Sequence, residues 1–160
     1  MATDPEPRWL DAAEKDAWTG LISMALLMPG RLEAPLHQEA GLTLFEYMTL
    51  SQISEAPART IRMSELAYLT NGSLSRLSNV VKRLENRGWV TRAPDPTDGR
   101  YTLATLTGPG YEVLAAAAPI HLRTVRELVL DPLDKADREA LARIAAKLRT
   151  LPSDYRQNPR

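Results

Sequence analysis

Residues 63–106 carry a succession of local patterns that few folds accommodate. A short amphipathic segment runs to Thr70, and Asn71-Gly72 then gives a turn signal. Ser73 is placed to cap a second helix, because its hydroxyl can accept a hydrogen bond from a backbone N–H one turn later. The apolar residues of that helix fall on one face, at Leu74, Leu77, Val80, Val81 and Leu84. Gly88 ends the helix, as glycine commonly does just past a helix terminus.

Two strand-like runs follow, at residues 89–93 and 101–106, and the loop between them contains two prolines and a glycine. Helix, tight turn, amphipathic helix and β-hairpin in this order are typical of a winged helix-turn-helix. We therefore predict a fold that is mainly α with a small β-hairpin wing (α+β).

The outer face of the second helix points to DNA. It carries hydrogen-bond donors and no acid, at Ser75, Arg76, Asn79, Lys82, Arg83 and Asn86. Cations replace the counterions of phosphates, and forked donors and amides suit base edges in the major groove. Ser75, Arg76 and Asn79 are the base-edge candidates, and Ser73, Lys82 and Arg83 the phosphate candidates. A polar outer face that is merely solvated is the alternative, although such a face usually interleaves acids.

The predicted hairpin loop contributes Arg100. A lone arginine on a narrow projection suits the minor groove, whose negative potential attracts it. Asp98, two residues earlier, can orient Arg100 through a bidentate pair or can stabilise the turn through backbone N–H groups. Arg62 and Arg92 are either further phosphate contacts or solvated surface. Charge agrees with this placement, since residues 62–100 hold 7 Lys and Arg against 4 Asp and Glu, whereas the whole chain is formally neutral.

These residues resemble the MarR family (multiple antibiotic resistance regulator) of winged-helix transcription factors. The resemblance rests on the fragments SELA (64–67), SLSRLS (73–78), RLENRGWV (83–90) and, above all, DGR (98–100) followed by LTGPG (106–110). Gly99 departs from the pattern, because many members have a second basic residue there. The resemblance implies a transcriptional regulator that binds double-stranded DNA, with a recognition helix at residues 73–87, a wing at 89–106, and a winged helix-turn-helix spanning 42–106.

The terminal segments predict a homodimer. Residues 8–41 read as a long helix with an apolar stripe containing Trp18, interrupted at Pro29-Gly30, where the helix should kink or split. Helices within residues 109–151 carry further apolar seams, including one that continues through Pro119 for about six turns. One small winged helix cannot cover this much apolar surface, which usually marks association, and the resemblance likewise implies that both terminal regions interlock in a dimer on a palindromic operator. The whole chain, 1–160, is expected to be a single domain.

Composition excludes several other classes of protein. No apolar run approaches the roughly 18–20 residues of a membrane span, and with no cysteine the chain fits a cytosolic, nucleoid-associated protein. Two distant histidines, His37 and His121, form neither a metal site nor a catalytic set, so we expect no enzyme activity, cofactor or metal. The remaining alternative is a winged helix used for protein–protein contact without specific DNA binding.

Members of the resembling family are often released from DNA by small aromatic or phenolic ligands. Residues able to line such a site between the terminal helices and the winged helix are Trp18, Met24, His37, Tyr47 and Met48, although aromatic and Met stripes at helical spacing are more often core. The absence of cysteine argues against sensing by thiol oxidation.

Overall fold

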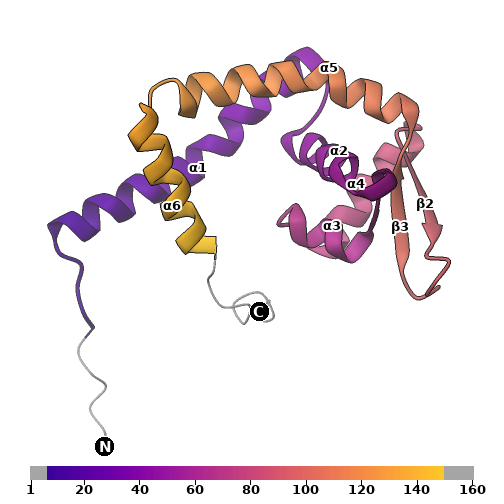
Figure 1. Cartoon of the computed structure of the whole chain (residues 1–160), viewed down its shortest axis with the longest axis horizontal. Coiled ribbons are helices and arrows are strands. Elements are labelled where there is room, and N and C mark those ends of the chain that lie inside the picture. Colours follow the sequence, from indigo (N-terminus) through magenta and orange to yellow (C-terminus); the bar gives the residue numbers. More distant parts are fainter. Residues whose placement is uncertain (1–6, 150–160) are drawn as a thin grey trace, which may run out of the picture. The chain divides into compact units, whose positions relative to one another are not determined.

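A computed structural model describes residues 7–149 (Figure 1), and contacts divide the chain into two units, Met1–Ile120 and His121–Arg160. The first unit contains the elements α1 (Ala12–Ala40), α2 (Leu44–Glu55), a 3₁₀ turn η1 (Pro57–Arg59), β1 (Thr60–Arg62), α3 (Met63–Leu69), α4 (Leu74–Asn86), β2 (Val90–Pro94) and β3 (Thr102–Leu106). Helix α5 (Gly108–Val125) begins in the first unit and ends in the second. A helix-turn-helix followed by a hairpin is therefore confirmed.

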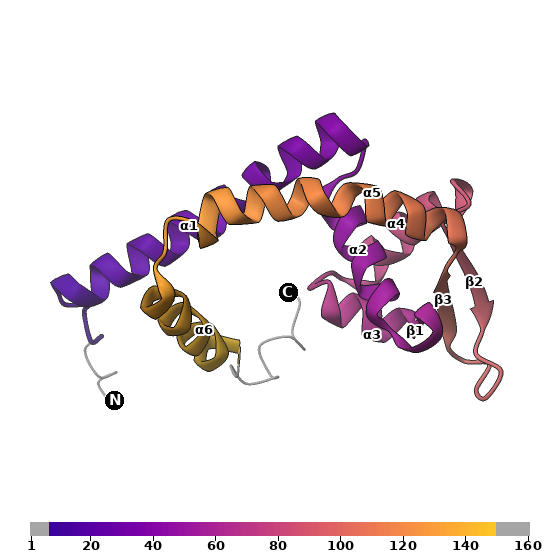
Figure 2. The ribbon, with the colours of Figure 1, turned by 45° about the horizontal axis from the view of Figure 1, so that its top comes forward.

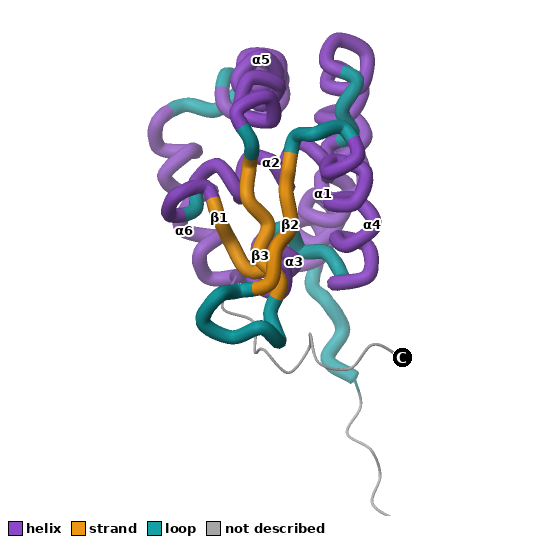
Figure 3. Tube along the Cα trace, turned by 90° about the vertical axis from the view of Figure 1, so that its right-hand side faces the viewer, coloured by secondary structure: helices purple, strands orange, loops and turns teal. Residues whose placement is uncertain are grey.

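The wing belongs to a three-stranded antiparallel sheet of order β1-β3-β2 (Figure 3). Strand β3 lies in the middle, with Thr105 paired to Thr60 on one side and to Thr91 on the other. The hydroxyls of Thr60 and Thr105 are 2.9 Å apart, which adds a side-chain bond across the pair. Strand β1 was not predicted from the sequence, because three residues are too few to show the alternation that marks a strand.

The core lies between α2, α3, α4 and the sheet. Leu77, Val80, Val81 and Leu84 of α4 are buried as predicted. The prediction that Leu74 belongs to this buried stripe is wrong, because its side chain is 54% exposed. Leu74 is the first residue of α4, and its side chain points towards the N-terminus of the helix, where no preceding turn of α4 lies.

Helix α1 is one helix, so of the kink or split expected at Pro29-Gly30 the split is wrong. Pro29 and Pro35 both lie inside it. A proline removes one backbone hydrogen bond of a helix, and the regular turns on both sides of each proline keep α1 together. The helix begins with a capping box formed by Asp11 and Glu14 and ends at Gly41, whose φ of 64° is the left-handed conformation that glycine adopts readily. The N-terminal half of α1 extends away from α2 and α4 (Figure 2).

Helix α5 starts one residue before Pro109, and Pro119 lies inside it. The helical path then widens into a π turn, η2 (Arg126–Leu130), so the predicted seam is not one uniform α-helix. In the second unit α6 (Lys135–Arg149) follows, and Asp134 caps it by accepting a hydrogen bond from the backbone N–H of Asp137 at 2.8 Å. Positions 150 and 151 of the predicted helical region lie outside the described residues.

Candidate nucleic-acid interface

Helix α4 presents three faces besides its buried stripe, and the outermost one carries Ser75 and Asn79, two of the three predicted base-reading residues. Ser73 caps the helix by accepting a hydrogen bond from the N–H of Arg76 at 3.2 Å. Ser75, Asn79 and Lys82 follow one another at intervals of four and three residues, so they share the exposed outer face. Their side chains are a hydroxyl, an amide and a cation, all able to donate to bases or phosphates.

Arg76 and Arg83 lie on the flank of α4 that faces α2. The Arg76 guanidinium carbon is 4.2 Å from the centre of the Phe45 ring, and Arg83 pairs with Glu46 at 3.3 Å. Glu46 is buried and also accepts from the N–H of Thr43, closing the capping box of α2. The start of α2 therefore fixes the direction of both arginines, which the sequence did not indicate.

The wing tip holds Arg100 in a fixed orientation. Its Nε and Nη2 bind the carboxylate of Asp98 at 2.9 and 2.6 Å, and its backbone N–H donates to the same carboxylate at 3.2 Å. Asp98 thus both orients the guanidinium and stabilises the turn. Hydrogen bonds from Arg100 lower the pKa of Asp98, and the same bonds raise the pKa of Arg100. Arg100 nevertheless keeps an 84% exposed side chain, and its guanidinium is always charged.

A second ion pair fastens the wing loop to β1. Arg62 binds the buried carboxylate of Asp95 through Nε at 2.9 Å and Nη2 at 2.7 Å, and its guanidinium carbon lies 4.5 Å from the ring centre of Tyr101. Asp95 also accepts from the backbone N–H of Thr97 at 2.8 Å and from its hydroxyl at 2.6 Å. The bonds from Thr97, with a smaller contribution from Arg62, lower the pKa of Asp95 to about 2. This pair joins residues 33 positions apart, and it was not predicted because strand β1 was not predicted.

Arg92 also forms an ion pair. The sequence left open whether Arg62 and Arg92 bind phosphates or are solvated, and the structure shows that each binds a carboxylate of the protein. Its Nη2 lies 2.7 Å from Glu85, and this pair links β2 to the last turn of α4. Hydrogen bonds from Arg92 lower the pKa of Glu85. The Arg92–Glu85 pair therefore joins the wing to α4, and the Arg62–Asp95 pair joins the wing loop to β1.

The five residues predicted to line a ligand site occupy different environments. Trp18 and Met24 are 54% and 51% exposed on α1, and His37 is exposed near its C-terminal end. Tyr47 is buried, and Met48 packs against the core. None of the five lines either of the two hollows that flank α4.

Two findings bear on other classes of site. Among residues 7–149 no helix combines the length and the hydropathy needed to span a bilayer. In the same part of the chain no group of three or more His, Cys, Asp and Glu side chains is arranged to hold a metal ion.

Comparison with known proteins identifies the family. Residues 40–100 match the model of the MarR family. The chain is 32% identical over 113 residues to the transcriptional regulator HosA of Escherichia coli O111:H-, covering 70% of this chain and 81% of HosA. It is also 32% identical over 108 residues to the transcriptional repressor Rv2887 of Mycobacterium tuberculosis, covering 68% of this chain and 76% of the relative.

Solved structures agree over nearly the whole length. The fold matches Sco3205, a MarR family regulator from Streptomyces coelicolor crystallised with DNA, with a TM-score of 0.87 and 39% identity over 94% of this chain and 96% of that one. AbsC from the same organism matches with a TM-score of 0.80 and 37% identity, over 91% of this chain and all of AbsC. This protein therefore belongs to the MarR family of winged-helix transcriptional regulators, which bind DNA and are not enzymes.

Proposed function

We propose that this protein represses transcription as a homodimer bound to a palindromic operator. The observation that carries the proposal is the exposed, acid-free outer face of α4 beside an exposed wing arginine. In a dimer, α4 of each protomer enters one of two successive major grooves, and Arg100 reaches the adjacent minor groove. Ser75, Arg76 and Asn79 read base edges, and Ser73, Lys82 and Arg83 bind phosphates, which set the register of the protein on the duplex.

Exposed apolar residues on α1 support the dimer. Trp18, Leu21 and Met24 are 54%, 42% and 51% exposed along one side of the helix. A large exposed apolar patch usually marks an association surface, and a two-fold arrangement is the commonest form of homodimer. We assign dimerisation to residues 8–41 and 109–151. A chain ending at Leu106 should then be monomeric by light scattering, and a dimer of that fragment would refute the assignment.

Repression, rather than activation, follows the described role of one relative, Rv2887. The effector is a separate part of the proposal, namely a small aromatic or phenolic molecule bound near Trp18, Met24, His37, Tyr47 and Met48. Titration of simple phenolic carboxylates into the protein–operator complex tests it. Release of DNA by one of them, lost in a His37→Ala variant that still binds the operator, is the expected result, and no release by any of them would overturn this part of the proposal.

Selection from a pool of random duplexes tests the central proposal. Full-length protein is mixed with the pool at moderate salt, and the retained duplexes are sequenced. An inverted repeat with half-sites about one helical turn apart is expected. Retention of no sequence by folded protein would overturn specific DNA binding, and a single half-site without symmetry would overturn the dimeric arrangement.

A further inference from the structure

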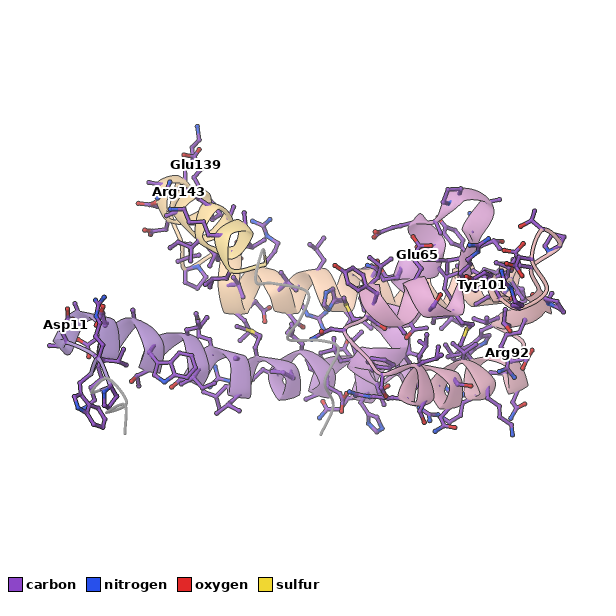
Figure 4. All side chains as sticks on the ribbon, turned by 90° about the horizontal axis from the view of Figure 1, so that it is seen from below. Asp11, Glu65, Arg92, Tyr101, Glu139 and Arg143 are labelled. Atoms are coloured by element: carbon purple, nitrogen blue, oxygen red, sulfur yellow. The ribbon has the colours of Figure 1, made fainter. Side chains whose placement is uncertain are left out.

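A hollow lies between α4 and the wing, on the flank of α4 opposite Arg76. We call it the wing-side hollow. Its apolar part is formed by Met63, Leu74 and Tyr101. Leu74 and Tyr101 are 54% and 39% exposed, so two large apolar side chains face solvent within a DNA-binding surface. Arg92 and Tyr101, on the two arms of the hairpin, lie near one another and both line the hollow (Figure 4).

Hydroxyl and guanidinium groups complete the wing-side hollow. Ser64 and Ser78 line it beside the apolar residues, and Arg100 stands at the wing. Because Arg100 binds Asp98 through Nε and Nη2, the donors on its Nη1 can serve another acceptor. The hollow thus combines an apolar floor with donors, and the Arg62 and Arg92 ion pairs hold its wing side in place.

We propose that the wing-side hollow binds the sugar–phosphate strand of DNA that separates the major groove from the adjacent minor groove. The inference rests on the proposed function, which places α4 in the major groove and Arg100 in the minor groove. A single strand of the duplex separates these grooves, so it must cross the gap between α4 and the wing. The apolar floor matches the C–H face of a deoxyribose, and the hydroxyls of Ser64 and Ser78 match a phosphate oxygen.

Residues on different faces of α4 have different roles in this proposal, contact with the sugar–phosphate strand or reading of base edges. Leu74 and Ser78 are four residues apart, so they share the face that lines the hollow. Ser75 and Asn79 share the outer face, which is directed to the floor of the major groove. Leu74 and Ser78 therefore contribute affinity that is independent of sequence, while Ser75 and Asn79 contribute specificity.

The test uses full-length protein and a duplex recovered by selection, together with two variants, Leu74→Ala and Ser78→Ala. Leu74→Ala should weaken binding about fivefold per half-site. This is the loss expected if roughly half of the leucine side chain is buried against DNA in the wild-type complex. The loss should be equal on duplexes containing thymine or uracil, because a sugar contact ignores the base methyl group. A loss that disappears on the uracil duplex would show that Leu74 reads a thymine methyl and would overturn the proposal.

Ser78→Ala is tested against duplexes in which one phosphate at a time is made neutral as a methylphosphonate. Ser78→Ala should weaken binding about tenfold or more, the loss expected for one hydrogen bond to a charged group. This loss should vanish on the duplex in which the contacted phosphate of each half-site is neutral. A loss that persists at every position would overturn the phosphate contact. Ser75→Ala is the matched control, since it should change base preference without this coupling. If wild-type protein binds the selected duplex and no coupling appears, only the hollow is wrong, whereas failure to select any duplex overturns the proposed function itself.

Discussion

Replacing Arg100 by alanine should lower both the affinity for operator DNA and the dependence of that affinity on salt. The variant removes a cation that is 84% exposed and leaves the Asp98 carboxylate without its partner at the wing tip. Each cation that displaces a DNA counterion contributes about 0.9 to the slope of log K against log salt. The two wings of a dimer therefore contribute about 1.8 to this slope. Wild type loses affinity faster than the variant as salt rises, so the ratio of their affinities should fall about 12-fold between 50 and 200 mM salt.

Fluorescence anisotropy of a labelled operator at five or six salt concentrations measures the slope. Arg100→Lys keeps the charge but cannot form the same bidentate pair with Asp98, so it should keep the slope and lose affinity. Arg143→Ala on α6, outside the unit that holds the wing, controls for net charge and should leave the slope unchanged. An Arg100→Ala slope equal to that of wild type would mean that the wing does not enter a groove.

Three further changes test the fold that supports the interface. Gly110→Ala should destabilise the protein by about 1–3 kcal/mol in denaturant unfolding, because a Cβ at this position would overlap the Trp89 carbonyl oxygen. Unchanged stability would refute this close contact. Ser73→Ala should cost about 1 kcal/mol in the same assay, through loss of the cap on the Arg76 N–H; a neutral result would mean that water replaces the cap. The bonds from Thr97 and Arg62 lower the pKa of Asp95 to about 2, below its value in the unfolded chain, so its ionised form stabilises the folded protein fully above about pH 4. This stabilisation is lost as the pH falls towards 2, and in Asp95→Asn the free energy of unfolding should therefore depend less on pH in that range. A variant with the same pH dependence as wild type would contradict the assignment.

Local patterns along the chain were sufficient to place the helices and the hairpin. The effects of a cap at Ser73, of Gly88 past a helix end and of the apolar period of α4 depend on neighbours within a few residues. They can therefore be predicted without the tertiary structure. The candidate DNA contacts were predicted for the same reason, because the outer face of a helix follows from its period alone. Leu74 was misassigned because the period gives a direction around the helix but not whether another element lies there.

Sequence by itself determined the fold class, the family resemblance and the candidate DNA-contact residues of α4 and the wing. Tertiary structure alone decided how those residues are held: the stacking of Arg76 on Phe45, the pairing of Arg62 with Asp95, and the hollow between α4 and the wing. The reason is physical. Caps and helical faces depend on residues within one or two turns, whereas an ion pair between residues 33 positions apart depends on the packing of the sheet, which no local pattern encodes.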